Sequence, residues 1–185
     1  FSKEVFKNSS KYHDINLSTE ILVIPEYYHE EFDLDDVLNK FDVSSIVAKK
    51  NVLISGQLTS LSSALDRKNI FKTIEIVTRE LSSFDDAGLI IKTNLGKNSK
   101  KDLALLKKVM NKYHKELKSE LGLKTPKIYL IHGDMSPLEL KSLYESEKLI
   151  CFISCTRGEG FGLQFLEAAR CGLPIIATNW SAYTE

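Results

Sequence analysis

Residues 149–170, LICFISCTRGEGFGLQFLEAAR, decide the fold of this 185-residue chain. The apolar run 149–154 predicts a buried strand, and LQFLEAAR predicts a short helix that ends at Arg170. Between them lies a glycine-rich turn, so unpaired backbone N–H groups and the positive end of the helix dipole would face a ligand. Gly160 and Gly162 carry no side chain to block its approach. This order predicts a site for a phosphate group.

Two carboxylates flank that predicted anion site, Glu159 in the turn and Glu167 in the helix. Carboxylates beside a phosphate are unfavourable unless the ligand also offers hydroxyls that they can accept from. A sugar nucleotide offers a diphosphate for the amides and hydroxyls for the carboxylates. A strand-to-helix turn with one solvated glutamate is the plainer interpretation, and a glycoside hydrolase would also use paired carboxylates. The glycine-rich anion site favours transfer from a nucleotide donor.

The rest of the chain alternates strands and helices. Strands are predicted at 51–55, 87–92, 126–131 and 174–178, with helices at 69–81 and 101–121 and another opened by Ser136-Pro137. Upstream, a helix is predicted at 2–11, a strand at 20–25, and an acidic connector to residue 47 with one helical turn near 34–41. The alternation predicts an α/β fold, a doubly wound parallel sheet with ligands at the carboxyl ends of its strands.

Composition narrows the class of protein. Hydrophobic residues make up 43% and charged residues 27%, the formal net charge is zero, and no run is long enough to span a membrane. The first residues do not form a signal peptide. Three cysteines among apolar neighbours indicate a reducing compartment, so we expect a cytoplasmic protein.

Charge is unevenly distributed along the chain. Residues 97–127 hold ten lysines, and a basic helix there would suit anionic lipid or nucleic acid. A solvated helix face is the simpler interpretation. Aromatic residues that could stack on bases are not regularly interleaved with these lysines, so the pattern does not support nucleic-acid binding. We therefore expect no nucleic-acid partner, and peripheral contact with the inner face of the membrane stays open.

The motif EGFGLxxLEA at 159–168, followed by CGLPIIAT at 171–178, resembles the donor site of GT-B glycosyltransferases. The nearest group is the retaining family often called family 4, and the resemblance runs from residue 51 onward. It implies the Rossmann-like C-terminal half of a GT-B fold. It also implies that Glu159 contacts the donor sugar and Glu167 the ribose hydroxyls. The backbone amides that hold sugar and diphosphate would be those of Gly160, Phe161, Gly162 and Leu163.

The resemblance also implies cations for the leaving diphosphate. An arginine usually follows the glycine after the first strand, but this chain has Gly56-Gln57. Lys68 fits the usual lysine position, and Arg67 would supply a second positive charge. Gly56 would line the crevice and His132 would lie beside the base, although a local hydrogen bond is as good an explanation for that histidine. No metal site is expected, since no His, Cys or Asp cluster has ligand spacing.

These observations predict an interdomain connector at 1–47, with the end of an N-terminal domain, and a donor-binding domain at 48–185 that is incomplete at its C-terminus. The predicted function is hexosyltransferase-like transfer, with retention, from a nucleoside-diphosphate sugar to a saccharide or lipid-linked acceptor in polysaccharide biosynthesis. No other cofactor is expected. The fragment alone would lack the N-terminal GT-B domain and be inactive. Gln57 keeps open a non-catalytic nucleotide- or sugar-binding module.

Overall fold

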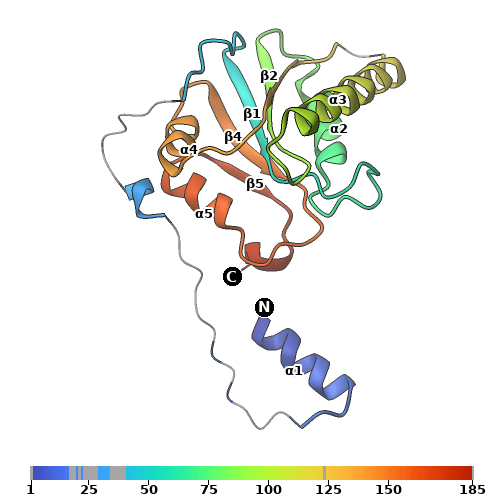
Figure 1. The fold of residues 1–185 in the computed structure, drawn as a ribbon, viewed down its shortest axis with the longest axis vertical. Helices are drawn as coiled ribbons and strands as arrows, with labels where there is room; N and C mark the ends of the chain where they lie inside the picture. Colours follow the sequence, from blue (N-terminus) through green and yellow to red (C-terminus); the bar gives the residue numbers. More distant parts are fainter. Residues whose placement is uncertain are drawn as a thin grey trace.

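A five-stranded parallel sheet organises the computed structural model, which describes residues 2–16, 20, 22, 29–33, 41–122 and 124–184 (Figure 1). The strand order is β3-β2-β1-β4-β5, and every neighbouring pair is parallel. The strands are β1 (Lys50–Ser55), β2 (Ala87–Lys92), β3 (Lys127–Ile131), β4 (Leu149–Ser154) and β5 (Ile175–Ala177). The predicted doubly wound α/β fold is confirmed.

The helices connect these strands much as the sequence predicted. They are α1 (Ser2–Tyr12), α2 (Ile70–Leu81), α3 (Lys100–Leu121), α4 (Pro137–Tyr144) and α5 (Leu163–Arg170), with short 3-10 turns η1 (Glu30–Asp33) and η2 (Ser181–Thr184). The strand predicted at 20–25 and the helical turn near 34–41 fall almost entirely outside the described residues. No described helix is both long and apolar enough to cross a lipid bilayer.

Helix ends are set by local polar groups. Ser136 accepts a hydrogen bond from the Glu139 N–H, and the Glu139 carboxylate accepts from the Ser136 N–H, so the predicted start of α4 is a capping box. Ser99 caps α3 through the Asp102 N–H, and Gly122 ends it in the left-handed region. These caps explain why α3 and α4 begin close to the positions that the sequence predicts.

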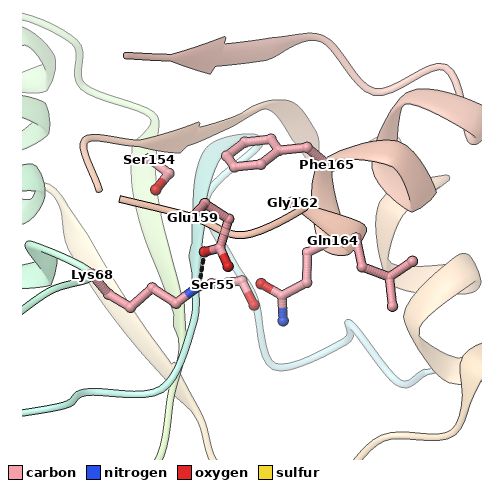
Figure 2. Close-up of a pocket in the computed structure, with 8 residues that line it drawn as sticks. Ser55, Lys68, Ser154, Glu159, Gly162, Gln164 and Phe165 are labelled. Atoms are coloured by element: carbon pink, nitrogen blue, oxygen red, sulfur yellow. Dashed lines mark hydrogen bonds and ion pairs between the residues drawn. The ribbon is translucent and has the colours of Figure 1, made fainter. Parts of the chain in front are cut away.

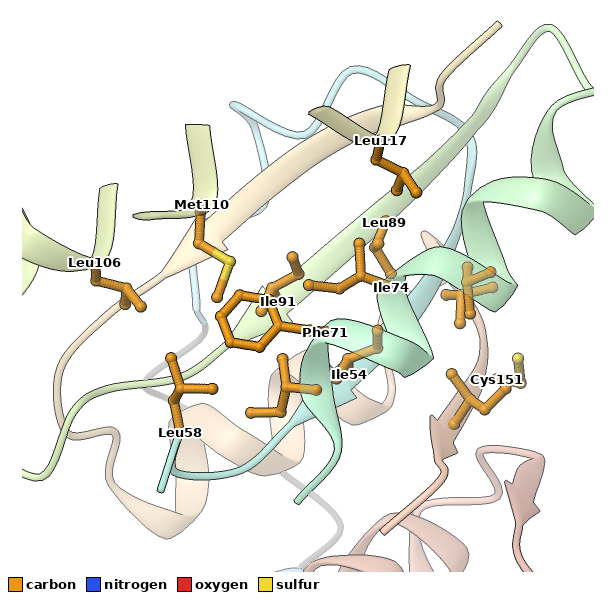
Figure 3. Packing of buried hydrophobic residues seen from close by; sticks show 14 residues of the cluster. Ile54, Leu58, Phe71, Ile74, Leu89, Ile91, Leu106, Met110, Leu117 and Cys151 are labelled. Carbon is orange, nitrogen blue, oxygen red and sulfur yellow. The ribbon is translucent and has the colours of Figure 1, made fainter. Parts of the chain in front are cut away.

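Two apolar layers cover the sheet because successive strand side chains alternate between its faces. On one face Leu89 and Ile91 pack under α2 and α3, with Ile74 and Met110 contributed by those helices (Figure 3). On the other face Leu53, Ile90 and Phe152 pack under α4 and α5 in a second cluster, which also contains Phe32 and Ile46 from upstream of the sheet. The sheet that carries the carboxyl ends of the strands is therefore packed against helices on both faces.

Replacement of Gly88 by alanine is expected to destabilise the domain by about 1–3 kcal/mol. A Cβ at this position of β2 would lie 2.1 Å from Asn51 Oδ1 and 3.0 Å from Ala48 Cβ. The fully buried Asn51 has little freedom to move, because its amide donates to the carbonyls of Ala48 and Lys148. Urea denaturation would measure the loss. Gly158→Ala is the control, because a Cβ there meets nothing within 4 Å.

Candidate functional site

A pocket of about 200 Å³ opens at the carboxyl edge of the sheet, between β1 and β4 (Figure 2). The strand order reverses between these two strands, because β2 and β3 lie on one side of β1 while β4 and β5 lie on the other. Ligands of open α/β sheets bind at such a switch point. The pocket is lined by Ser55, Lys68, Ser154, Glu159, Gly162, Leu163, Gln164 and Phe165.

The glycine turn presents free amides to this pocket. Gly162 caps α5 from the left-handed region, with φ 87°, where a side chain would be strained. Among the described residues, none accepts a hydrogen bond from the N–H of any residue from Gly160 through Gln164. Five successive unpaired donors at the positive end of a helix form a site for an anion.

Glu159 and Lys68 face each other across the pocket and form an ion pair. Their side chains are only 17% and 18% exposed. Arg67 adds a second cation, with Nη1 3.6 Å from Glu159 Oε2, and it donates to the Gly158 carbonyl at 2.6 Å. The structure therefore brings together, from positions about ninety residues apart, the three side chains predicted to take part in transfer.

The segment that carries Arg67 and Lys68 is built around the buried carboxylate of Asp66. Asp66 Oδ1 accepts hydrogen bonds from the N–H and hydroxyl of Thr59 and from the Lys68 N–H, and Oδ2 accepts from the Ile70 N–H at 2.7 Å. Lys68 then crosses over Gly56, where a Cβ would lie 3.4 Å from Lys68 Cδ. Gly56 thus supports the lysine from below, and it is not among the pocket-lining residues.

Two residues hold the glycine turn in position, Arg157 and Ser181. The sequence allowed Arg157 to pair with Glu159 or with phosphate. Arg157 donates to the carbonyls of Ser63 and Ala64, so it ties the turn to the Lys68 segment and is not paired with Glu159. Ser181 accepts from the Glu159 N–H at 3.1 Å and donates to the Glu159 carbonyl at 2.7 Å. The Ser181 contact could not be predicted from sequence spacing, because it joins η2 to a loop 22 residues away.

Glu167 lies one turn further along α5 and outside the pocket lining. It is only 3% exposed, and its carboxylate makes no hydrogen bond to another described residue. Burial raises the pKa of Glu167, and the neighbouring His29 offsets part of that rise. Burying a carboxylate without a hydrogen-bond donor is unfavourable in the free protein. Such an arrangement is expected at a binding site, where the ligand supplies the missing donors.

His132 is held by a local partner. Its Nε2 lies 2.8 Å from Asp102 Oδ2, and both side chains are buried. Burial acts to raise the pKa of Asp102, but the hydrogen bonds from His132 and the Leu95 N–H outweigh burial and hold it below its ordinary value. His132 therefore links the end of β3 to the start of α3. Within the described part of the chain, no three His, Cys, Asp or Glu side chains gather as a metal site.

Gln57, which stands where an arginine was expected, does not line the pocket. Its amide lies beside Gly96, where a Cβ would come 2.8 Å from Gln57 Nε2. Ser55 and Ser154, at the ends of β1 and β4, do line the pocket, and the sequence placed both at strand ends that could face a crevice without giving either a role. Strand-end position was the available signal for both.

Comparison with solved structures shows the same fold in several glycosyltransferases. The C-terminal domain of a glycosyl transferase group 1 family protein (LpcC) from Francisella tularensis is 24% identical, with a TM-score of 0.54 over 77% of this chain and 64% of that one. A trehalose 6-phosphate synthase from Burkholderia multivorans is 9% identical, with a TM-score of 0.54 over 77% of this chain and 32% of that one. A UDP-forming trehalose-phosphate synthase from Burkholderia vietnamiensis is 10% identical, with a TM-score of 0.51 over 76% and 32%.

Since the chain spans less than two thirds of these proteins, the likeness concerns one fold unit. No curated protein sequence matches the chain. The family model described as glycosyl transferases group 1 matches residues 49–185, which is well over half of the sequence and includes the whole pocket. The chain belongs to the glycosyl transferases group 1 family.

Proposed function

We propose that this chain binds a nucleoside-diphosphate sugar and serves as the donor-binding half of a retaining, hexosyltransferase-like enzyme. The observation that carries the proposal is the run of backbone N–H groups from Gly160 to Gln164 that have no acceptor among the described residues. Its last three residues line the pocket with Lys68 and Glu159 at the switch point of the sheet. A diphosphate suits the amides and the lysine, and a sugar suits the carboxylate. Membership of a transferase family supports the same reaction class.

In this proposal each group has a defined task. Amides from Gly160 to Leu163 and the Lys68 ammonium stabilise the charge that develops on the leaving diphosphate, and Arg67 adds to that field. Glu159 orients Lys68 and accepts from sugar hydroxyls, which fixes the donor for attack. Glu167 accepts from the ribose, and His132, anchored by Asp102, borders the base. The donor is a substrate, and we propose no further cofactor.

The acceptor is proposed to be a saccharide or a lipid-linked saccharide, bound across a cleft by an N-terminal GT-B domain. We place residues 1–47 in the connector and the end of that domain, and residues 48–185 in the donor domain. Polysaccharide assembly in the cytoplasm, at the inner face of the membrane, is the proposed setting. Three free cysteines and the lysine-rich exposed face of α3 support that placement.

A non-catalytic binding module is the second candidate, and the position of Gln57 favours it. Gln57 stands where an arginine is expected, and its side-chain amide lies beside Gly96, so this position supplies no positive charge for the diphosphate. Such a module would bind the same ligands but would not support transfer in the full-length protein. Binding and turnover therefore separate the two candidates.

Calorimetric titration of the 185-residue chain with UDP, GDP and ADP tests the donor site, with Glu167→Gln as the diagnostic variant. One of the three is expected to bind saturably, and Glu167→Gln to weaken it about tenfold, because the amide replaces a charged acceptor for the ribose hydroxyls.

Stability provides the control for that variant. The pKa of Glu167 is raised in the folded protein, so folding stability falls as pH rises from the unfolded pKa through the folded one. Glu167→Gln removes this loss, and it should melt no lower than the wild type at neutral pH. Absence of binding by all three nucleotides, or unchanged binding by Glu167→Gln, contradicts the proposed roles.

A further inference from the structure

Ser55 has a buried hydroxyl with no partner. The residue is 7% exposed, its Oγ makes no hydrogen bond to another described residue, and it lines the pocket beside Lys68 and Glu159 (Figure 2). Its counterpart on β4, Ser154, also lines the pocket, but there the hydroxyl accepts from the Thr156 N–H at 3.3 Å. An unpaired buried hydroxyl costs free energy in the empty protein, and a ligand that supplies an acceptor removes that cost.

Lys92 is the in-register neighbour of Ser55 on the next strand. On β2 the alternation places Lys92 with Ile90, and on β1 it places Ser55 with Leu53; both apolar residues belong to the layer under α4 and α5. The two polar side chains therefore project from the same face of the sheet at neighbouring strand ends, and Lys92 lies just outside the residues that line the pocket. Neighbouring strands are about 4.8 Å apart, well within the reach of a lysine.

Lys92 is half-buried and has no ion pair with any described carboxylate within 4 Å. Burial lowers the pKa of its ammonium, and the more distant Asp134 opposes that change. A cation withdrawn from water without a close counter-charge is unfavourable, so an anionic partner is to be expected from the ligand.

We propose that Ser55 and Lys92 form a second phosphate-binding edge of the pocket and take the place of the arginine that Gln57 replaces. The amides of α5 and Lys68 hold the diphosphate from one side. The Ser55 hydroxyl donates to a phosphate oxygen from the floor, and the Lys92 ammonium approaches from β2. This inference rests on the proposed donor site, since it names further residues that bind the same diphosphate.

The test compares a nucleoside diphosphate with its nucleoside, using whichever of UDP, GDP or ADP binds the wild-type chain. Ser55→Ala is expected to weaken the diphosphate about three- to tenfold, and Lys92→Met about tenfold or more. Neither variant should change the affinity for uridine, guanosine or adenosine. Lys92→Arg, which keeps the charge, should bind the diphosphate more tightly than Lys92→Met.

Thr78→Val is the matched control. Thr78 on α2 also has a buried hydroxyl without a partner, but it lies outside the pocket. Both Thr78→Val and Ser55→Ala should melt at or above the wild-type temperature, because each removes an unsatisfied hydroxyl. Only Ser55→Ala should reduce affinity for the diphosphate.

The outcomes separate the two proposals. Wild-type binding that Ser55→Ala and Lys92→Met leave unchanged overturns this inference while the donor site stands. Equal loss of diphosphate and nucleoside affinity overturns it too, because it points to a general distortion of the pocket. If the wild-type chain binds none of the three diphosphates, both proposals fall together.

Discussion

Replacement of Lys68 by alanine is expected to weaken nucleoside-diphosphate binding by about ten- to a hundredfold, equivalent to about 1.5–3 kcal/mol. The variant removes a cation that is only 18% exposed and leaves the Glu159 carboxylate at the pocket wall with the more exposed Arg67, 3.6 Å away, as its counter-charge. The diphosphate then loses the attraction of the Lys68 ammonium and is repelled more strongly by the Glu159 carboxylate. Titration calorimetry of the two proteins at the same ionic strength would measure the change, because charge contacts are screened by salt.

Lys72→Ala is the control for this experiment. Lys72 also forms an ion pair, with Glu75 at 2.9 Å, but it is 53% exposed and sits on α2 away from the pocket. Exposed pairs contribute little to stability, and this one has no route to the ligand. The double variant Lys68→Ala/Glu159→Gln should recover part of the affinity. If Lys68→Ala binds as well as Lys72→Ala, Lys68 has no role in the donor site.

Replacement of Asp66 by alanine is expected to cost about 3 kcal/mol of folding stability and to lower nucleotide affinity as well. Asp66 is fully buried and accepts hydrogen bonds from Thr59, from the Lys68 N–H and from the Ile70 N–H. Alanine leaves those donors unsatisfied and frees the segment that carries Lys68. Urea denaturation gives the stability change, and titration under native conditions gives the affinity.

Asp66→Asn provides an intermediate step, because its one carbonyl oxygen can keep the Thr59 and Lys68 contacts while its amide group opposes the Ile70 N–H. Asp42→Asn is the matched control, since Asp42 is exposed and its hydrogen bonds are with the neighbouring Ser44. It should change neither property. A stable Asp66→Ala protein would mean that the donors find water, and that the carboxylate does not organise the segment.

Most of the secondary structure followed from local patterns. The apolar runs and the Ser136-Pro137 signal predicted all five strands and the start of α4, because strand burial and helix capping depend on residues a few positions apart. The glycine turn at 158–162 and the helix after it were predicted for the same reason. The parallel sheet then followed from the alternation of strands and helices.

The roles of individual side chains at the site were harder to predict from the sequence. Lys68 and Glu159 were selected by resemblance, but their ion pair joins residues 91 positions apart. Arg157 was free, on sequence grounds, to pair with Glu159 or with phosphate, and the fold directs it to the carbonyls of Ser63 and Ala64. Ser55 and Lys92 could be named from the sequence as polar residues at strand ends, but no role could be assigned to them. Neither belongs to a motif, and only the pairing of β1 with β2 shows that they are neighbours.

The sequence by itself determined the α/β class, the positions of the strands and the anion-binding character of the turn before α5, since these depend on periodicity and on backbone groups within one short segment. Only the tertiary structure decided which strands are neighbours, and so which side chains share the pocket. Pairing β1 with both β2 and β4 places Ser55 beside Lys92 and brings it to one pocket with Ser154, and the Asp66 network brings Lys68 to Glu159. Such contacts are set by packing between distant segments, which no local pattern records.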